Sequence, residues 1–180
     1  DEQSDVQKTR GTNDTVLATR HGQSIRFHES DVREMGRATA GVKGIELAKG
    51  DRVIGMVVVH ERAELLVVSE KGIGKRSDLA DYRVQKRGGK GIITMQRTEK
   101  TVELVALKDV LPDDELMMIT KGGIIIRCPV QGIRVSGRNT QGVKLMNLDA
   151  GDRIIDVARI QKEDEADDEA EAEAPSEAAT

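Results

Sequence analysis

Residues 64–77 read ELLVVSEKGIGKRS, and this stretch decides the fold. An apolar run at 65–68, of two leucines and two β-branched valines, is followed by Ser69, two polar residues and Gly72. A second short run then ends on two basic residues. Short β-branched runs that are bounded by glycine are typical of two strands joined by a tight turn. The stretch therefore predicts a β-hairpin.

The same pattern occurs twice more along the chain. Residues 15–28 read TVLATRHGQSIRFH, and residues 115–128 read ELMMITKGGIIIRC. The Thr or Ser that follows the first run recurs at Thr19, Ser69 and Thr120, with spacings of 50 and 51 residues. Self-similarity at such a period indicates a repeat architecture.

Each hairpin is followed by a glycine-rich basic loop that leads into an apolar strand, and then by a closing strand. The loop regions are GRATAGVKGIEL (36–47), QKRGGKGIITM (85–95) and GRNTQGVKLMNL (137–148), and the closing strands are 51–59, 102–110 and 152–160. Each repeat thus holds about four strands in roughly 50 residues, the size of one propeller blade. We predict an all-β, propeller-like fold of four-stranded blades, with helix limited to a short turn at 31–36.

The repeats divide the chain into five segments. Residues 1–12 are a linker or a partial blade, and the three blades occupy 13–60, 61–110 and 111–160. Residues 161–180 form an acidic tail without apolar periodicity, which we expect to be disordered. Because propeller rings typically hold about four to eight blades, three blades predict half of a larger domain, or assembly with another copy.

Charge and composition exclude several classes of protein. The formal net charge is −4, but residues 161–180 contain one basic and nine acidic residues, so the remainder is net basic. Phe27 and Tyr82 are the only aromatic residues, which excludes a surface that binds single strands by base stacking. Cys128 is the single cysteine, and no residues have the spacing of a metal site. The sequence has no apolar run that could span a membrane, and we expect a reducing cytoplasm.

The heptad QKRGGKG (85–91) resembles the gyrase A box, with Lys86 in place of an arginine. Residues 24–45, 74–92, 116–127 and 137–145 are also similar to the C-terminal domain of the DNA gyrase A protein. The resemblance implies a six-bladed β-pinwheel that wraps duplex DNA around its rim, with these repeats as blades four to six and 85–91 as a degenerate box. It also implies a bacterial, nucleoid-associated enzyme of two A and two B subunits. The partners would be duplex DNA, the gyrase B subunit and the rest of the gyrase A subunit. ATP and magnesium would bind on other domains or subunits, and this chain would hold no cofactor.

We call residues 36–43, 86–93 and 137–144 the Gly-rich loops, and their basic side chains are candidates for binding DNA phosphates. Glycine permits positive φ and a close approach of backbone N–H groups to phosphate oxygens. The alternative is that the glycines only form turns and the basic side chains only solvate them. The candidate DNA-binding residues are Gln85, Lys86, Arg87, Gly88, Gly89, Lys90 and Gly91, with Arg37, Lys43, Arg138 and Lys144 in the equivalent loops and Arg33, Arg83 and Arg134 on the connections before them.

A second basic set lies at the ends of the hairpins. It comprises Arg26, Lys75, Arg76 and Arg127. Recurrence of this set and of the arginines on the connections favours a shared role, which is either contact with the DNA backbone or salt bridges between blades through Asp31 and Asp81.

We predict no catalytic residue. The three histidines (His21, His28 and His60) lie at strand or loop ends apart from carboxylates, and Tyr82 is expected to serve in packing. A phosphate-binding P-loop motif is absent. The predicted function is that of a C-terminal fragment of gyrase A, which wraps duplex DNA for ATP-dependent negative supercoiling. The alternatives are the corresponding domain of topoisomerase IV, which decatenates DNA, and a protein-interaction module without a role on DNA.

Overall fold

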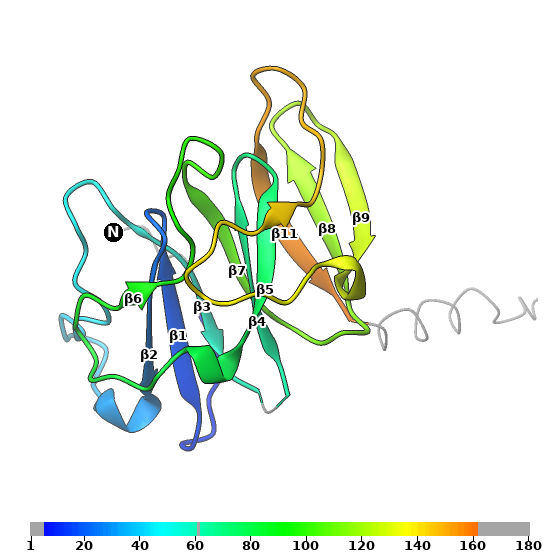
Figure 1. The fold of residues 1–180 in the computed structure, drawn as a ribbon. Coiled ribbons are helices and arrows are strands. Elements are labelled where there is room, and N and C mark those ends of the chain that lie inside the picture. The colour runs from blue at the N-terminus through cyan, green and yellow to red at the C-terminus, as the bar shows by residue number, and fades with distance from the viewer. Residues whose placement is uncertain (1–5, 61, 162–180) are drawn as a thin grey trace, which may run out of the picture.

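The computed structural model describes residues 6–60 and 62–161, which form three antiparallel sheets side by side (Figure 1). The first sheet, blade 1, consists of β1 (Asp14–Thr19), β2 (Gln23–His28), β3 (Val53–Val58) and β6 (Ile92–Ile93). Blade 2 consists of β4 (Glu64–Ser69), β5 (Ile73–Asp78), β7 (Leu104–Val110) and β10 (Val143–Lys144). Blade 3 consists of β8 (Glu115–Thr120), β9 (Ile125–Pro129) and β11 (Ile154–Ile160).

The helical content of the described residues is confined to three short 3₁₀ turns, one after each hairpin. They are η1 (Glu29–Asp31), η2 (Leu79–Asp81) and η3 (Val130–Gly132). The all-β prediction is therefore confirmed, whereas the prediction of a single short turn at 31–36 is wrong, because the first 3₁₀ turn lies at 29–31 and the later hairpins have turns of their own. The predicted tail lies outside the described residues, apart from Gln161.

Each hairpin turn is closed by the Thr or Ser that recurs in the sequence. The hydroxyl oxygen of Thr19 accepts a hydrogen bond from the backbone N–H of Gln23, at 3.2 Å. Ser69 and Thr120 accept the same bond from Ile73 and Ile124, each at 3.2 Å. All three hydroxyl residues are buried. Their regular spacing in the sequence thus reflects one turn geometry used three times.

The fourth strand of a blade comes from the following repeat, which corrects the prediction of four strands per repeat. In blade 1 the strand order is β3-β1-β2-β6, and β6 belongs to the second repeat. In blade 2 the order is β10-β5-β4-β7, and β10 belongs to the third repeat. Blade 3 has three strands in the described part of the chain. The strand predicted after the first Gly-rich loop does not form, and the described residues contain no earlier hairpin that 36–47 could join.

Two of the core clusters among the described residues fill the spaces between neighbouring blades, and β4 supplies side chains to both, while a smaller cluster around Ile25 and Phe27 lies within the first repeat. Leu65 and Val67 pack toward blade 1, in a cluster with Val16. Leu66 and Val68 point to the opposite face, in a cluster with blade 3. Burial on both faces explains why the first strand of this hairpin is a continuous apolar run rather than an alternating one.

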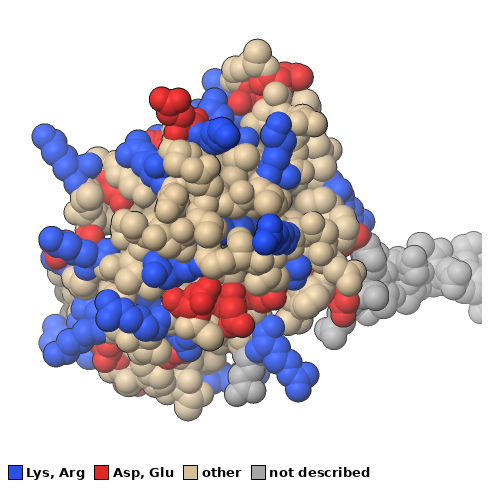
Figure 2. Space-filling model, viewed as in Figure 1, with Lys and Arg blue, Asp and Glu red and all other residues tan. Residues whose placement is uncertain are grey.

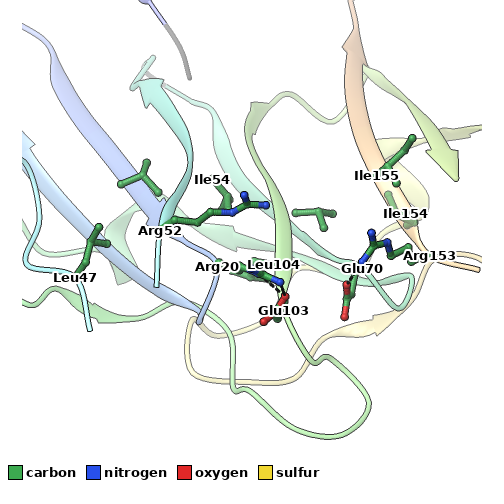
Figure 3. Close-up of a pocket in the computed structure, with 12 residues that line it drawn as sticks. Arg20, Leu47, Arg52, Ile54, Glu70, Glu103, Leu104, Arg153, Ile154 and Ile155 are labelled. Carbon is green, nitrogen blue, oxygen red and sulfur yellow. Dashed lines mark hydrogen bonds and ion pairs between the residues drawn. The ribbon is translucent and has the colours of Figure 1, made fainter. Parts of the chain in front are cut away.

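The inner strands β3, β7 and β11 follow one another along the inside of the assembly and line a groove of about 800 Å³ (Figure 3). Arg20, in the hairpin turn of blade 1, forms an ion pair with Glu103, which directly precedes β7. Glu70, in the hairpin turn of blade 2, lies 3.8 Å from Arg153, which directly precedes β11. These pairs join each hairpin turn to the next repeat. No helix among the described residues is long and apolar enough to cross a membrane.

Candidate nucleic-acid interface

The last glycine of the second and of the third Gly-rich loop sets up the addition of the exchanged strand. Gly91 has a φ of +76°, and a Cβ placed there would lie 2.3 Å from the carbonyl oxygen of Ser24. Gly142 has a φ of +88°, and its Cβ would lie 2.6 Å from the carbonyl oxygen of Gly74. Only glycine fits both the backbone conformation and the space. The turn-forming alternative therefore accounts for these two glycines.

The other glycines of the heptad serve the chain as well. Gly88 has a φ of +83°, and its N–H donates a hydrogen bond to the carbonyl oxygen of Gly44, at 2.7 Å. Gly89 does not adopt positive φ, and its carbonyl oxygen accepts a hydrogen bond from Glu46. The N–H of Gly88 is therefore already engaged within the protein and is not free for a phosphate.

Gln85 lies against β2 rather than toward solvent. Its backbone N–H donates to the carbonyl oxygen of Arg26, at 2.7 Å. Its side-chain Nε2 is buried and has no partner among the described residues. The side-chain nitrogen of Gln85, a predicted DNA-binding residue, is therefore not exposed to solvent.

The two half-buried arginines of the Gly-rich loops donate to backbone carbonyl groups. Arg87 Nε donates to the carbonyl oxygen of Asp31, at 3.0 Å, and its Nη1 donates to that of Lys43. Arg138 makes the equivalent bonds in the next repeat. The guanidinium groups of these two predicted phosphate ligands are therefore already hydrogen-bonded within the protein.

The remaining predicted cations project into solvent. They are exposed, and within residues 6–60 and 62–161 their side chains make no hydrogen bond or ion pair. Figure 2 shows Lys and Arg side chains along the edge over blade 1 and across the visible face, with an acidic group between them. The exposed set comprises Arg33, Arg37, Lys43, Arg83, Lys86, Lys90, Arg134 and Lys144.

The arginines at the ends of the first two hairpins hold successive repeats together, but not through the predicted salt bridges between blades. Arg26 forms an ion pair with Asp14 at 2.7 Å, and its Nη1 donates to the carbonyl oxygens of Leu79 and Tyr82, each at 3.1 Å. Arg76 does the same in the next repeat, with Glu64 at 2.7 Å and the carbonyl oxygen of Ile133 at 2.7 Å. The partners between repeats are carbonyl groups around the 3₁₀ turns rather than Asp31 and Asp81. Arg127 forms the corresponding ion pair with Glu115 in blade 3.

Lys75 is fully buried beneath the third Gly-rich loop. Its Nζ donates to the carbonyl oxygen of Gly137 at 2.8 Å, to the hydroxyl of Thr140 at 3.1 Å and to the carbonyl oxygen of Arg138. Burial, together with the nearby charge of Arg138, lowers the pKa of Lys75 to about 8. The equivalent hairpin residues are Ile25 and Ile126, so this cation is particular to blade 2.

No catalytic arrangement emerges from the described residues. Tyr82 is buried, its hydroxyl lies 2.6 Å from that of Thr94, and burial raises the pKa of its phenol. The prediction that Tyr82 serves in packing is therefore confirmed. The prediction that the histidines lie apart from carboxylates is wrong for His60, whose Nδ1 is 2.9 Å from Asp109 Oδ2, and for His21, whose Nδ1 is 3.9 Å from Asp51 Oδ1. In the described ranges no cluster of His, Cys, Asp or Glu could hold a metal ion.

Comparison with known proteins supports the propeller-like fold and its division into three repeats. The model of the DNA gyrase C-terminal domain, a beta-propeller, matches residues 13–60, 63–110 and 114–161. The chain belongs to this family. The family assignment and the propeller-like architecture predicted from the sequence are both confirmed.

The curated relatives of this gyrase C-terminal domain chain are much longer proteins. It is 48% identical to the DNA gyrase A protein of Deinococcus deserti over 155 residues, which is 83% of this chain and 19% of the relative. It is 43% identical to the DNA gyrase A protein of Staphylococcus epidermidis over 167 residues, which is 92% of this chain and 19% of the relative. The chain thus spans about a fifth of the length of these relatives.

Two solved structures share the fold over most of the chain. The C-terminal domain of DNA topoisomerase IV matches with a TM-score of 0.86 and 25% identity, covering 93% of this chain and 53% of that one. The DNA gyrase A C-terminal domain matches with a TM-score of 0.78 and 28% identity, covering 83% and 51%. Three blades therefore correspond to about half of each solved domain.

Proposed function

We propose that this chain is part of a gyrase A subunit, within its C-terminal domain, and that it binds duplex DNA along its Gly-rich loops. The observation that carries the proposal is the set of exposed lysine and arginine side chains on the Gly-rich loops and on the connections before them, where Arg33, Arg83 and Arg134 recur in all three repeats. Each phosphate that such a side chain neutralises releases counterions, which favours binding to any duplex sequence. The family assignment supports the same conclusion.

The duplex backbone, rather than unstacked bases, is the proposed ligand. Phe27 and Tyr82 are both buried, so no phenylalanine, tyrosine or tryptophan ring in the described chain is available to stack on a base. Basic side chains that follow one another over adjacent blades favour bending of DNA over the surface. Smooth bending of about 20–30 base pairs by 40–90° costs roughly 1–6 kcal/mol, which additional phosphate contacts offset.

In the whole enzyme, such wrapping would present a crossed DNA segment for ATP-driven strand passage and so introduce negative supercoils. The proposed partners are the gyrase B subunit, together with the rest of the gyrase A subunit, in an assembly of two A and two B subunits. ATP and magnesium would bind outside this chain, to which we assign no catalytic residue. The assembled enzyme would be located in the bacterial cytoplasm, in association with the nucleoid.

Salt dependence tests the DNA-binding step. Duplexes of unrelated sequence should bind with similar affinity, and log K should fall steeply and linearly with log salt. A double variant, Lys86→Gln with Lys90→Gln, should weaken binding to all duplexes alike and reduce the slope. The matched control replaces two exposed lysines in the turns before β3 and β7, Lys49→Gln with Lys100→Gln. A flat salt dependence, or strong preference for one sequence, would contradict the proposal.

Decatenation is the second candidate function, favoured by the structural match to the C-terminal domain of topoisomerase IV. An assay of the assembled enzyme distinguishes the two functions. A gyrase converts relaxed plasmid to negatively supercoiled plasmid when ATP is supplied. A topoisomerase IV unlinks catenated circles without adding negative supercoils.

A further inference from the structure

Within the Gly-rich loops, we propose a division of labour between arginine and lysine. Arg87 and Arg138 are positioning residues that fasten their loops to the preceding repeat, and the exposed lysines of the same loops (Lys86, Lys90 and Lys144) are the residues that face phosphate. The inference concerns the architecture of the interface and rests on the proposed function only for its DNA-binding half.

The contacts of Arg87 connect three parts of the chain. Its Nε donates to the carbonyl oxygen of Asp31, the last residue of η1, and its Nη1 donates to that of Lys43 in the first Gly-rich loop. The side chain thus joins the loop at 86–93 to both the 3₁₀ turn and the loop of the repeat before it. It does so from a half-buried position.

The contacts of Arg138 reproduce this arrangement one repeat later. Its Nε donates to the carbonyl oxygen of Asp81, the last residue of η2, at 3.2 Å, and its Nη1 donates to that of Ile93. Its backbone N–H also donates to Asp81 Oδ2, at 3.3 Å. Asp81 is equivalent to Asp31 and Ile93 to Lys43, so both arginines use the same two carbonyl positions. Two independent copies of one contact pattern indicate a function of the fold.

The chemistry of the guanidinium group suits this role. Arginine presents several N–H donors in a rigid plane, so adjacent nitrogens can reach two carbonyl groups at once. Lysine is a single flexible cation, which suits a solvated contact with a phosphate. Lys86 and Lys90 flank Arg87 in the sequence, yet both are exposed and have no partner in the described part of the chain. Neighbouring positions of one loop therefore face opposite environments.

Arg37 occupies the equivalent position in the first repeat and provides an internal comparison. It is exposed and contacts no carbonyl group, because the described residues include no repeat before it. The arginine is thus half-buried where a preceding repeat supplies carbonyl groups, and solvated where none does.

A charge-matched pair of variants in the full chain tests the inference. Arg87→Gln and Lys90→Gln each remove one positive charge from the same loop. For Lys90→Gln we expect the slope of log K against log salt to fall in magnitude by about 0.9, with amide hydrogen exchange unchanged. For Arg87→Gln we expect an unchanged slope and about tenfold faster exchange at Gly88 and Gln85, whose N–H groups bond to the first repeat.

Further variants separate the possible failures. Arg87→Lys retains the charge but replaces donors on two separate nitrogens by a single shorter-reaching ammonium group, so it should loosen the loop as Arg87→Gln does. If Arg87→Lys protects the loop amides as arginine does, or if Arg87→Gln lowers the slope while exchange stays unchanged, the positioning role is overturned. Arg138→Gln and Lys144→Gln repeat the comparison in the third loop. If neither Lys90→Gln nor Lys144→Gln alters the slope, the proposed DNA contact fails, while the exchange data still decide the role of the arginines.

Discussion

Lys75 Nζ, in β5, donates a hydrogen bond to the hydroxyl of Thr140, 65 residues later in the chain, at 3.1 Å. The same ammonium group donates to the carbonyl oxygens of Gly137 and Arg138, so one buried cation holds the third Gly-rich loop onto blade 2. Burial and the positive charge of Arg138 lower the pKa of this group more than the nearby carboxylate of Asp81 raises it. The contact therefore makes stability depend on pH.

The stability of the chain should rise with pH through the contribution of Lys75. Its pKa is about 8 in the folded chain and 10.5 as an ordinary lysine. Between these values the unfolded state binds more protons, so the free energy of unfolding increases by up to about 1.4 kcal/mol per pH unit. Below about pH 8 both states are protonated and this contribution is constant. Urea denaturation from pH 7 to pH 10 measures the effect.

Lys75→Met is the control for this titration. Burial raises the pKa of Cys128 and of Tyr82, so these two groups make stability fall as the pH rises toward and above 9. Both remain in the variant, and the difference between the two chains isolates Lys75. An equal pH profile for the two chains would show that the ammonium group has an ordinary pKa in the folded state.

Gly142→Ala should destabilise the chain considerably more than Gly41→Ala. Both glycines end a Gly-rich loop with positive φ, +88° and +76°, which costs a residue with a Cβ roughly 1–3 kcal/mol. At Gly142 the added methyl would also lie 2.6 Å from the carbonyl oxygen of Gly74 and displace β10. At Gly41 no atom lies within 4 Å. Urea denaturation of the two variants measures the difference, and equal losses would mean that β10 does not pack as described.

The hairpins could be predicted from the sequence because their determinants are local and repeated. Thr19, Ser69 and Thr120 each accept a bond from a residue four positions later, so the turn leaves a fixed signature in the chain. The exchange of strands leaves no such signature. Strands β6 and β10 have two residues each, and their partners lie about 70 residues earlier in the chain.

The roles of the basic residues were predictable only in part, since arginine and lysine in a glycine-rich loop both suggest phosphate binding. One signal does separate them. Arginine occupies the second position of all three Gly-rich loops, at Arg37, Arg87 and Arg138, whereas Lys86 and Lys90 are replaced by other residue types in the other repeats. The arginines that have carbonyl partners thus occupy a constant position, whereas Lys86 and Lys90 occupy variable ones. Constancy alone does not decide the role, because Arg33, Arg83 and Arg134 also recur in all three repeats and are exposed.

Leu66→Ala should cost about 2–5 kcal/mol, because it opens a cavity in the cluster between blades 2 and 3. Leu66 is fully buried, and its neighbours Leu116 and Met118 come from another repeat. Leu111→Ala is the matched control, since Leu111 is 38% exposed. We expect a loss below about 1 kcal/mol there. Thermal or urea unfolding of both variants gives the comparison, and similar losses would argue against a core placed between the blades.

Tyr82→Phe separates a packing role from a chemical one. The substitution keeps the buried ring and removes the hydroxyl that lies 2.6 Å from the hydroxyl of Thr94. Leaving Thr94, itself fully buried, without this partner should lower the free energy of unfolding by roughly 1–3 kcal/mol. Because the phenol is buried and burial raises its pKa, it is a poor nucleophile toward a phosphate. Affinity for duplex DNA at a temperature where both chains are folded should therefore be unchanged. A variant that folds normally yet loses DNA binding would place Tyr82 at the interface and contradict its assignment to the core.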